Sequence, residues 1–536
     1  MVSTTSDSSI GCALMTESIA KTEKLFDQRR EQAFKFTRCK WGGMIMDAIL
    51  FWNAVALECN RFDHTGVMAA SNQRGPTLSS RALAIVHIAM HDAYVLARRG
   101  LGTPPAANDV YIPPSLRPAY THDGSSTAHV TASAVAAAAS IVLLDLFPAQ
   151  SSRINDAFAT FSGMGADVAG HRLGEEVGSV VLKLRAEDGA AVANAAHMDS
   201  AAYGAHREDP LNRGQGFLGV RYGSVRPFAI TKWHNLEKHP AVNSPEYLAD
   251  HQEVRTKGAH VGYKNLDRTP TQTLIGIYWA YDGVKEIGTP PRQYNQIIRQ
   301  VSESKKLTEE QNARLFFLIN IAMADAGILA WYWKYRYDLW RPINGIRELD
   351  HAMGPAPIAA GSTLSDNCDP FWHPLGAPKT NCPDEKVRSF TPPFPAYPSG
   401  HATFGATAFH IARKYLSSIN LAKIAPDGSD DIAFDFVSDE MNGSAIDPDN
   451  TVRTRHLRHF VGLHQAIYEN SISRVYLGVH WRFDGTSAQD PLGAITANDS
   501  IGGVPLGIAI ANDIIDRADI APSANDVRPP AFVATP

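Results

Sequence analysis

Two long alanine-rich apolar stretches constrain the fold of this chain more than any other feature. They are SSRALAIVHIAMHDAYVLA at 79–97 and TAHVTASAVAAAASIVLLDLF at 127–147. Both place apolar residues at helical spacing, and both are longer than a typical strand. Alanine has the highest helix propensity, and its small side chain lets neighbouring helices approach closely. Buried and tightly packed helices are therefore expected in this part of the chain.

The rest of the chain continues this helical character and predicts an all-α fold. Further helical patterns run through 270–336, 403–416, 456–476 and 506–515, and few segments alternate like strands. We expect two helical bundles with long connecting loops. The predicted parts are a polar N-terminal extension at 1–45, a first bundle at 46–201, an irregular connection at 202–268, a second bundle at 269–516 and a disordered tail at 517–536.

Composition and charge exclude several kinds of partner. The chain is 44% hydrophobic and 20% charged, as in ordinary globular proteins, and its net charge of −5 argues against a nucleic-acid partner. The apolar stretch 44–56 is interrupted by Asp47 and Asn53 and is too short to cross a bilayer. The N-terminus lacks the basic start and apolar run of a secretory signal. We expect no membrane span.

The five cysteines do not form a metal or redox motif. Their number is odd, and no C-x-x-C spacing occurs. Cys368 and Cys382 flank a proline-rich loop and are the one pair suited to a disulfide. Independent free thiols are the favoured interpretation.

The first of three short motifs that indicate function is KYRYDLWRP, from Lys334 to Pro342. Lys334 and Arg341 are seven residues apart, so on one continuous helix they would project from the same face. Pro342 would then mark the end of that helix. The alternative is an ordinary solvated cationic face, but the neighbouring tryptophans argue against free solvation.

The second motif is PSGH, from Pro398 to His401. Ser399 is a natural N-cap for a helix that starts near residue 402, and Gly400 allows a ligand to approach the main-chain amides. Free amides at a helix start bind anions, and His401 would project into the same space. Taken alone, the motif also fits a simple cap followed by a surface histidine.

The third motif is SRVYLGVH, from Ser473 to His480. Arg474 and His480 are six residues apart and would face different ways on an unbroken helix. We therefore expect the helix to end near Gly478, so that His480 turns back toward Arg474. Such a histidine can ligate a metal or act as a nucleophile, although a buried core histidine is the alternative.

The three motifs together predict one site for a small, multiply charged oxyanion such as phosphate or vanadate. They supply three permanent cations, two imidazoles and a Ser-Gly turn. Arginine offers a planar fork of donors to tetrahedral oxygens, and lysine adds a compact charge.

The motifs and several longer stretches resemble the vanadium-dependent haloperoxidases, most of all the fungal-type vanadium chloroperoxidases. Their relatives, the type 2 phosphatidic acid phosphatases and bacterial class A acid phosphatases, share the motif arrangement. The stretches are ILFWNAVALECNR (49–61), GIYWAYDGVKEIGTPPRQYNQI (276–297), PPFPAYPSGHATFG (392–405) and IGGVPLGI (501–508). The likeness runs from about Ile49 to Ile515 but leaves 202–268 poorly matched.

This resemblance implies an oxidoreductase that uses hydrogen peroxide to oxidise a halide to hypohalous acid, which then halogenates small organic acceptors. The implied cofactor is vanadate, as vanadium(V), without haem. His480 is the implied covalent ligand of vanadate, His401 the acid–base group and Lys334 the residue that activates bound peroxide. The implied donors to the vanadate oxygens are Lys334, Arg341, Ser399, Gly400 and Arg474. An extracellular location is implied by the family alone.

The resemblance also implies a halide pocket and a supporting carboxylate. Trp331 and Phe394 match the apolar halide pocket of the chloroperoxidases, and many algal bromoperoxidases have a histidine in place of that phenylalanine. Asp282 matches a carboxylate that pairs with Arg474. We therefore expect chloride oxidation, with bromide also accepted.

Other functions fit parts of the same sequence. An acid phosphatase could use His480 as nucleophile and His401 as the acid, and an oxyanion-binding protein could keep the site without turnover. His87 and His91 stand one helical turn apart and are followed by Asp92, a spacing that could bind zinc, but a structural role is favoured. A haem-thiolate peroxidase using Cys382 is the remotest alternative.

Overall fold

A computed structural model describes residues 47–65, 71–106, 109–121, 127–163, 165–192, 194, 196–197, 200–383, 385–496, 500–517 and 519–530. The predicted polar extension at 1–45 lies outside these residues. From Ala48 onward the chain forms one compact unit, and the division into two bundles near residues 201 and 269 stays a prediction.

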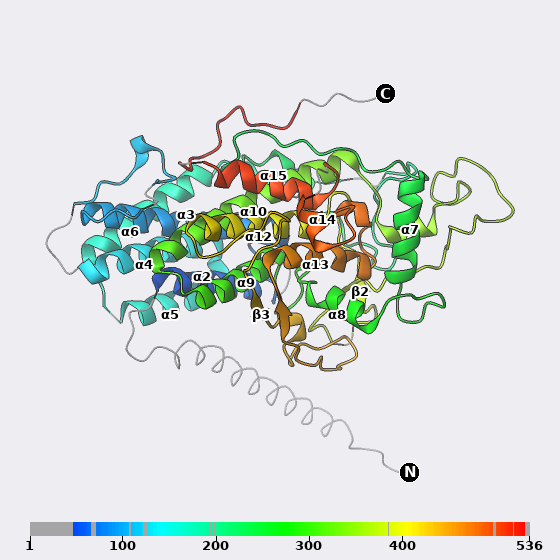
Figure 1. Cartoon of the computed structure of the whole chain (residues 1–536), viewed down its shortest axis with the longest axis horizontal. Coiled ribbons are helices and arrows are strands. Elements are labelled where there is room, and N and C mark those ends of the chain that lie inside the picture. The colour runs from blue at the N-terminus through cyan, green and yellow to red at the C-terminus, as the bar shows by residue number, and fades with distance from the viewer. Residues whose placement is uncertain are drawn as a thin grey trace, which may run out of the picture. The chain divides into compact units, whose positions relative to one another are not determined.

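The described unit is predominantly helical, as the sequence predicted (Figure 1). The α-helices before residue 200 are α2 (Ala48–Asp63), α3 (Gly75–Gly100), α4 (Thr127–Leu146), α5 (Ser151–Ser162) and α6 (Val168–Arg185). Those after it are α7 (Pro245–Lys257), α8 (Pro270–Tyr278), α9 (Pro290–Lys305), α10 (Glu309–Tyr337), α11 (Pro342–Arg347), α12 (Gly400–Ser418), α13 (Leu463–Tyr476), α14 (Pro491–Thr496) and α15 (Gly503–Ile515).

Short strands form two antiparallel pairs between these helices. β1 (Ala377–Pro378) pairs with β2 (Ser389–Phe390), and β3 (Phe434–Phe436) pairs with β4 (Arg458–Phe460). The short 3₁₀ turns are Pro114–Leu116, Pro148–Gln150, Ala190–Val192, Tyr222–Ser224, Asp439–Met441 and Arg482–Asp484.

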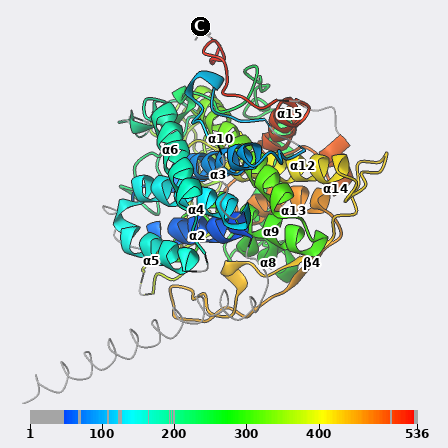
Figure 2. The ribbon, with the colours of Figure 1, turned by 90° about the vertical axis from the view of Figure 1, so that its left-hand side faces the viewer.

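Close packing of α4 against α6 follows from the small residues of both helices. A Cβ atom added to Gly174 of α6 would lie 2.1 Å from the Ala134 carbonyl oxygen of α4, and one added to Gly170 would lie 2.3 Å from the Val130 carbonyl. The helices approach this closely only because neither carries a larger side chain at the crossing. Figures 1 and 2 both show the two helices side by side.

Helix α10 connects the alanine-rich helices to those that carry the motifs. It packs on α3 and also on α12, which in turn contacts α13 and α15. By length and hydropathy α10 and the 129–146 part of α4 could span a bilayer, but 94% and 67% of these stretches are buried inside the unit. They have the character of core helices.

The segment 202–268, predicted as irregular, contains α7. Ser244 caps this helix by accepting a hydrogen bond from the Tyr247 amide, and Pro245 occupies its first position. Serine followed by proline is a helix-start signal, so this element was detectable from sequence.

Part of the predicted disordered tail is ordered against the compact unit. Within residues 519–530, Ile520 and Val527 are buried, and the Ile520 amide donates to Asp109 Oδ2 at 2.9 Å. Two apolar side chains and specific hydrogen bonds outweigh the proline-rich composition that suggested disorder here.

Candidate functional site

Lys334 lies in the last turn of α10 with its side chain fully buried. Its Nζ donates hydrogen bonds to the carbonyls of Pro395 (2.9 Å), Ala396 (3.1 Å) and Pro398 (2.6 Å). The lysine thereby ties the proline-rich segment before α12 to the end of α10. Burial lowers the pKa of Lys334 well below its usual value, and the charge of Arg341 lowers it further.

Arg341 is not on the same helix as Lys334, which corrects the sequence interpretation. Helix α10 ends at Tyr337, where Asp338 adopts a left-handed conformation (φ 49°), and Pro342 begins α11 instead of ending a helix. Proline suits the first position of a helix because its missing amide has no partner there. Arg341 is therefore the N-cap residue of α11.

The Arg341 guanidinium is fully buried and faces His480. Its Nε donates to the Phe394 carbonyl, and its Nη1 donates both to the Val479 carbonyl and to His480 Nε2, each at 2.8 Å. Its Nη2 has no hydrogen-bond partner among the described residues. Burial lowers the pKa of Arg341 to about 9. One N–H donor of this buried group is thus left without a hydrogen-bond partner among the described residues.

The predicted helix start at Ser399 is confirmed. Ser399 caps α12 by accepting a hydrogen bond from the Ala402 amide at 3.4 Å. His401 is buried in the first turn, where its Nε2 lies 2.7 Å from the Ala280 carbonyl oxygen. Because a carbonyl only accepts, Nε2 is the donor. Burial, together with the charge of Arg474, lowers the pKa of His401 well below its usual value.

The predicted break after Arg474 is also confirmed. Helix α13 ends at Tyr476, Gly478 adopts φ 71°, and the Val479 amide returns to the Arg474 carbonyl. A left-handed residue after the last turn is a common way to end a helix. The turn places His480 beside the cations, as the six-residue spacing predicted.

His480 is held by Asp484, a residue that the sequence reasoning did not select. The His480 Nδ1 lies 2.7 Å from Asp484 Oδ2, while its Nε2 accepts from Arg341. The imidazole is therefore neutral with the proton on Nδ1. Burial lowers the pKa of His480 well below its usual value and raises that of Asp484 to about 8. The four-residue spacing in HWRFD was the available signal.

Asp282 pairs with Arg474 as expected. Its two carboxylate oxygens accept from Arg474 Nη2 at 2.8 Å and Nη1 at 3.1 Å. This bidentate pair leaves Arg474 Nε, which is buried and has no partner among the described residues. Burial raises the pKa of Asp282, although Arg474 opposes the shift.

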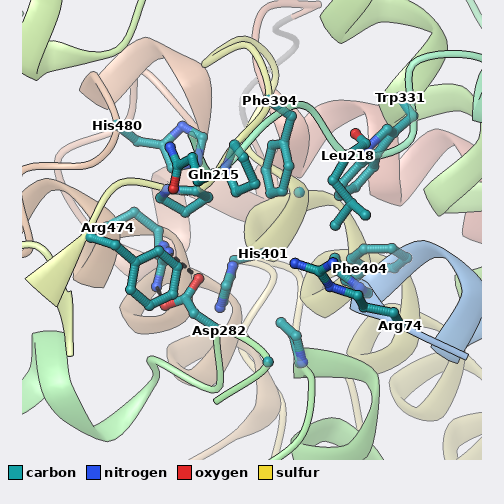
Figure 3. Close-up of a pocket in the computed structure, with 18 of the residues that line it drawn as sticks. Arg74, Gln215, Leu218, Asp282, Trp331, Phe394, His401, Phe404, Arg474 and His480 are labelled. Carbon is teal, nitrogen blue, oxygen red and sulfur yellow. Dashed lines mark hydrogen bonds and ion pairs between the residues drawn. The ribbon is translucent and has the colours of Figure 1, made fainter. Parts of the chain in front are cut away.

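One cavity of about 200 Å³ is lined by Asp282, His401, Arg474 and His480 (Figure 3). Of the predicted site residues, Lys334, Arg341 and Ser399 are not among its lining residues. The lining residues are His64, Arg74, Gly75, Pro76, Gln215, Leu218, Asp282, Gly283, Pro290, Trp331, Phe390, Pro392, Pro393, Phe394, Gly400, His401, Phe404, Arg474 and His480.

Trp331 and Phe394 form an aromatic wall of this cavity. Their ring centroids lie 4.7 Å apart, and the Trp331 Nε1 donates to the Leu218 carbonyl at 3.1 Å. Lys334 Nζ lies 5.0 Å from the centre of the Phe394 ring and 5.5 Å from that of Trp331. The buried ammonium is therefore in contact distance of the aromatic faces, where water is excluded.

The residues of the alternative zinc site, His87 and His91, make structural contacts in the core. His87 Nδ1 lies 2.6 Å from the Leu83 carbonyl oxygen and its Nε2 lies 2.9 Å from Asn53 Nδ2, so both ring nitrogens are engaged. His91 stacks on Phe317 at 4.1 Å. Both are core contacts. Cys368 and Cys382 are free thiols.

Three lining residues, His64, Arg74 and Gln215, carried no signal in the sequence. They lie far along the chain from the three motifs, and none belongs to a recognisable pattern. Another polar side chain that the sequence did not reveal is His206, which is buried with both ring nitrogens unpartnered among the described residues.

Known proteins match this chain over most of its length. Residues 45–210 match the family model described as the vanadium chloroperoxidase N-terminal domain, and residues 314–501 match the vanadium chloroperoxidase second helical-bundle domain. A vanadium chloroperoxidase from Curvularia inaequalis is 33% identical over 90% of this chain and 91% of its own.

Solved structures share the fold at low identity. A bacterial vanadium-dependent iodoperoxidase superposes with a TM-score of 0.58 at 17% identity, covering 91% of this chain and 100% of the other. The apo form of a bacterial vanadium-dependent chloroperoxidase has a TM-score of 0.56 at 15% identity, covering 83% and 95%. With a buried His480, its cationic neighbours and two matching domain models, this chain belongs to the vanadium chloroperoxidase family of vanadium-dependent haloperoxidases.

Proposed function

We propose that this enzyme oxidises chloride, and also bromide, with hydrogen peroxide at a vanadate held by His480. The observation that carries the proposal is the set of buried, unpartnered donors beside His480. Arg341 Nη2 and Arg474 Nε have no partner among the described residues, although leaving a charged donor unpaired in the interior costs free energy. An oxyanion bound there would satisfy both.

Other residues of the site also offer groups that would bind vanadate. His480 Nε2 carries the lone pair that a covalent ligand of vanadium needs, because Nδ1 donates to Asp484. Binding there would replace the hydrogen bond that Nε2 accepts from Arg341. The first amides of α12, at Gly400, and the hydroxyl of Ser399 would donate to further oxygens. Lys334 supplies charge while its own hydrogen bonds fix the surrounding loop.

Bound vanadate would supply a Lewis acid that activates peroxide while vanadium stays in the +5 oxidation state. The protein supplies the proton transfers. Because His401 Nε2 donates to the Ala280 carbonyl, its Nδ1 is the atom that can take a proton from peroxide and return it. In the overall reaction, peroxide, halide and a proton give hypohalous acid and water.

The aromatic wall supports the choice of chloride. Chloride is harder to oxidise than bromide and needs a more strongly polarised oxidant in a drier site. Trp331 and Phe394 exclude water next to Lys334, so its charge is weakly screened. This supports chloride as a substrate.

The experiment that tests the proposal is a halogenation assay on metal-free protein, with and without orthovanadate, comparing chloride with bromide. We expect activity with both halides only after vanadate is added. Bromide turnover without any chloride turnover in fully loaded enzyme would contradict the chloride assignment alone.

The same assay separates the phosphatase alternative, because vanadate acts with opposite sign in the two functions. A phosphatase using His480 as nucleophile would hydrolyse an aryl phosphate in the metal-free state and would be inhibited by vanadate. A haloperoxidase, in contrast, is activated by vanadate. Vanadate-inhibited phosphatase activity without halogenation would therefore overturn the proposal.

A further inference from the structure

Arg74 is a charged side chain at the cavity that the proposed chemistry leaves without a role. It lines the cavity together with Arg474 and His480, but it is exposed, whereas those two are buried. Figure 3 shows its guanidinium reaching into the cavity from the side opposite Arg474. Within the described part of the chain, no hydrogen bond or ion pair occupies it.

The backbone around Arg74 is fixed in place, so the position of this cation is built into the fold. Arg74 is the residue before α3, and Gly75 follows with φ 78°. The Gly75 amide donates to His64 Nε2 at 3.2 Å, and His64 Nδ1 lies 2.8 Å from the Asn60 carbonyl of α2. A Cβ atom on Gly75 would lie 2.5 Å from the Leu218 side chain. The turn at Gly75 is therefore held by His64 on one side and by Leu218 on the other.

None of the neighbouring groups in the described part of the chain forms an ion pair with Arg74. His64 accepts a hydrogen bond at Nε2 and is neutral; burial lowers its pKa, and Arg74 itself contributes to that shift. The carboxylate of this turn, Asp63, is taken by the amides of Asn72 and Gln73 at 2.9 and 2.8 Å. Deeper in the cavity, Asp282 is taken by Arg474.

The rest of the lining near Arg74 is mostly apolar, including Pro76, Leu218, Pro392 and Phe404. A small anion loses hydration as it enters such a passage, so it enters slowly without a cation to attract it. A charge at the mouth of a low-dielectric cavity concentrates ions of opposite sign there. Guanidinium is itself weakly hydrated and suits weakly hydrated anions such as halides.

We propose that Arg74 recruits the halide at the cavity mouth and thereby sets the apparent affinity for halide. This rests on the proposed haloperoxidase function and assigns a residue to the entry of one of its substrates. Hydrogen peroxide is uncharged, so Arg74 does not affect its entry. The residue acts before the chemical step and leaves the rate at saturating halide unchanged.

The test compares R74Q, R74K and a matched control, R172Q. Arg172 is an exposed arginine of α6, outside the cavity lining, so R172Q removes the same charge elsewhere. In vanadate-loaded enzyme with a neutral acceptor, R74Q should raise the KM for bromide about fivefold. The kcat and the KM for peroxide should stay within about twofold of wild type, and R74K and R172Q should resemble wild type.

Salt provides a second readout. The kcat/KM for bromide should fall with ionic strength in wild type and depend less on it in R74Q, because screening weakens attraction to a fixed charge. A KM for bromide that is unchanged in R74Q, or equally raised in R172Q, would overturn the proposal. An equal rise in the KM for peroxide would show a structural effect and would overturn it as well.

A measurement on metal-free protein separates this inference from the proposed function. Iodide should quench tryptophan fluorescence, including that of Trp331 in the cavity wall, less efficiently in R74Q than in wild type or R172Q. Quenching by neutral acrylamide should be the same in all three. If wild type oxidises no halide but this difference is present, the proposed function fails while halide recruitment by Arg74 stands. Equal iodide quenching in all three proteins refutes recruitment.

Discussion

Two histidines of the cavity, His401 and His480, are held by hydrogen bonds at opposite ring nitrogens. His480 donates through Nδ1 to Asp484 and presents Nε2 to Arg341, whereas His401 donates through Nε2 to the Ala280 carbonyl and keeps the Nδ1 lone pair. Both are neutral because burial disfavours the imidazolium form and nearby cations repel it. One ring is thus suited to ligation and the other to proton transfer.

Replacing His480 by alanine should abolish tight vanadate retention, because cations without a covalent ligand hold an oxyanion only loosely. Vanadate retained after dialysis can be measured directly by elemental analysis. The comparison is His401→Ala, which should keep vanadate yet lower halide oxidation about 100-fold or more, as expected for loss of a general acid–base group. Equal loss of vanadate in the two variants would contradict this division of roles.

Phe394 is the residue at which halide preference can be tested. Phe394→His should lower kcat/KM for chloride more than that for bromide, because a polar ring admits water beside Lys334 and weakens its field. We expect a change in the chloride-to-bromide ratio of about tenfold, equivalent to about 1.4 kcal/mol. Phe390→His is the control, since Phe390 lines the cavity but lies less deeply buried. Parallel losses for both halides would remove the basis of the chloride proposal.

At the scale of elements, the start of α12 is positioned by α15 lying against it. A Cβ atom on Gly503 would lie 2.6 Å from the Ser399 carbonyl oxygen, and one on Gly507 would lie 2.5 Å from the Thr403 carbonyl. Thr407 Oγ1 also donates to the Gly507 carbonyl at 3.1 Å. The Ser-Gly-His turn therefore depends on a contact between backbones that only glycine permits.

Gly507→Ala should push α15 away from α12 and lower the free energy of unfolding by about 1 to 3 kcal/mol, as overpacking does. Halide oxidation should fall as well, because the turn at Ser399 moves. Gly493→Ala in α14 is the matched control, since a Cβ there meets its nearest neighbour at an ordinary 3.4 Å. Chemical unfolding monitored by circular dichroism measures the difference. Equal stability of the two variants would show that the contact is not tight.

At the scale of the whole molecule, the irregular connection is tied to the core by a buried carboxylate. Asp325 of α10 accepts hydrogen bonds from the amides of Phe228, Ala229 and Ile230 at 2.5, 2.8 and 3.0 Å. Burial raises its pKa to about 6. One side chain thus satisfies three consecutive amides at 228–230, which lie outside any helix or strand, and this fixes the course of that stretch over α10.

Buried neutral histidines link the stability of this unit to pH. His251 is fully buried on Trp481, with both ring nitrogens unpartnered among the described residues, and burial lowers its pKa from 6.5 to about 4. A lowered folded-state pKa means that the unfolded chain binds the proton more tightly. The contribution of His251 to stability is therefore complete above pH 6.5 and is lost as pH falls toward 4.

His251→Phe should accordingly be less sensitive to acid than wild type. Relative to wild type, the variant should gain about 3 kcal/mol in free energy of unfolding between pH 6.5 and 4, because phenylalanine takes up no proton. Urea unfolding at a series of pH values measures the gain. Parallel pH curves for the two proteins would show that His251 binds its proton as readily in the folded state as in the unfolded chain.

What the sequence determined by itself was local in origin. Helical periodicity predicted the fold class, Ser399 predicted the start of α12, and the spacing of Arg474 and His480 predicted the turn at Gly478. The tertiary structure alone decided that Arg341, the N-cap of a separate helix, contacts His480 and that Arg74 lines the same cavity as His480. Periodicity and caps arise from neighbours within about two turns, whereas convergence of distant residues depends on the path of the whole chain.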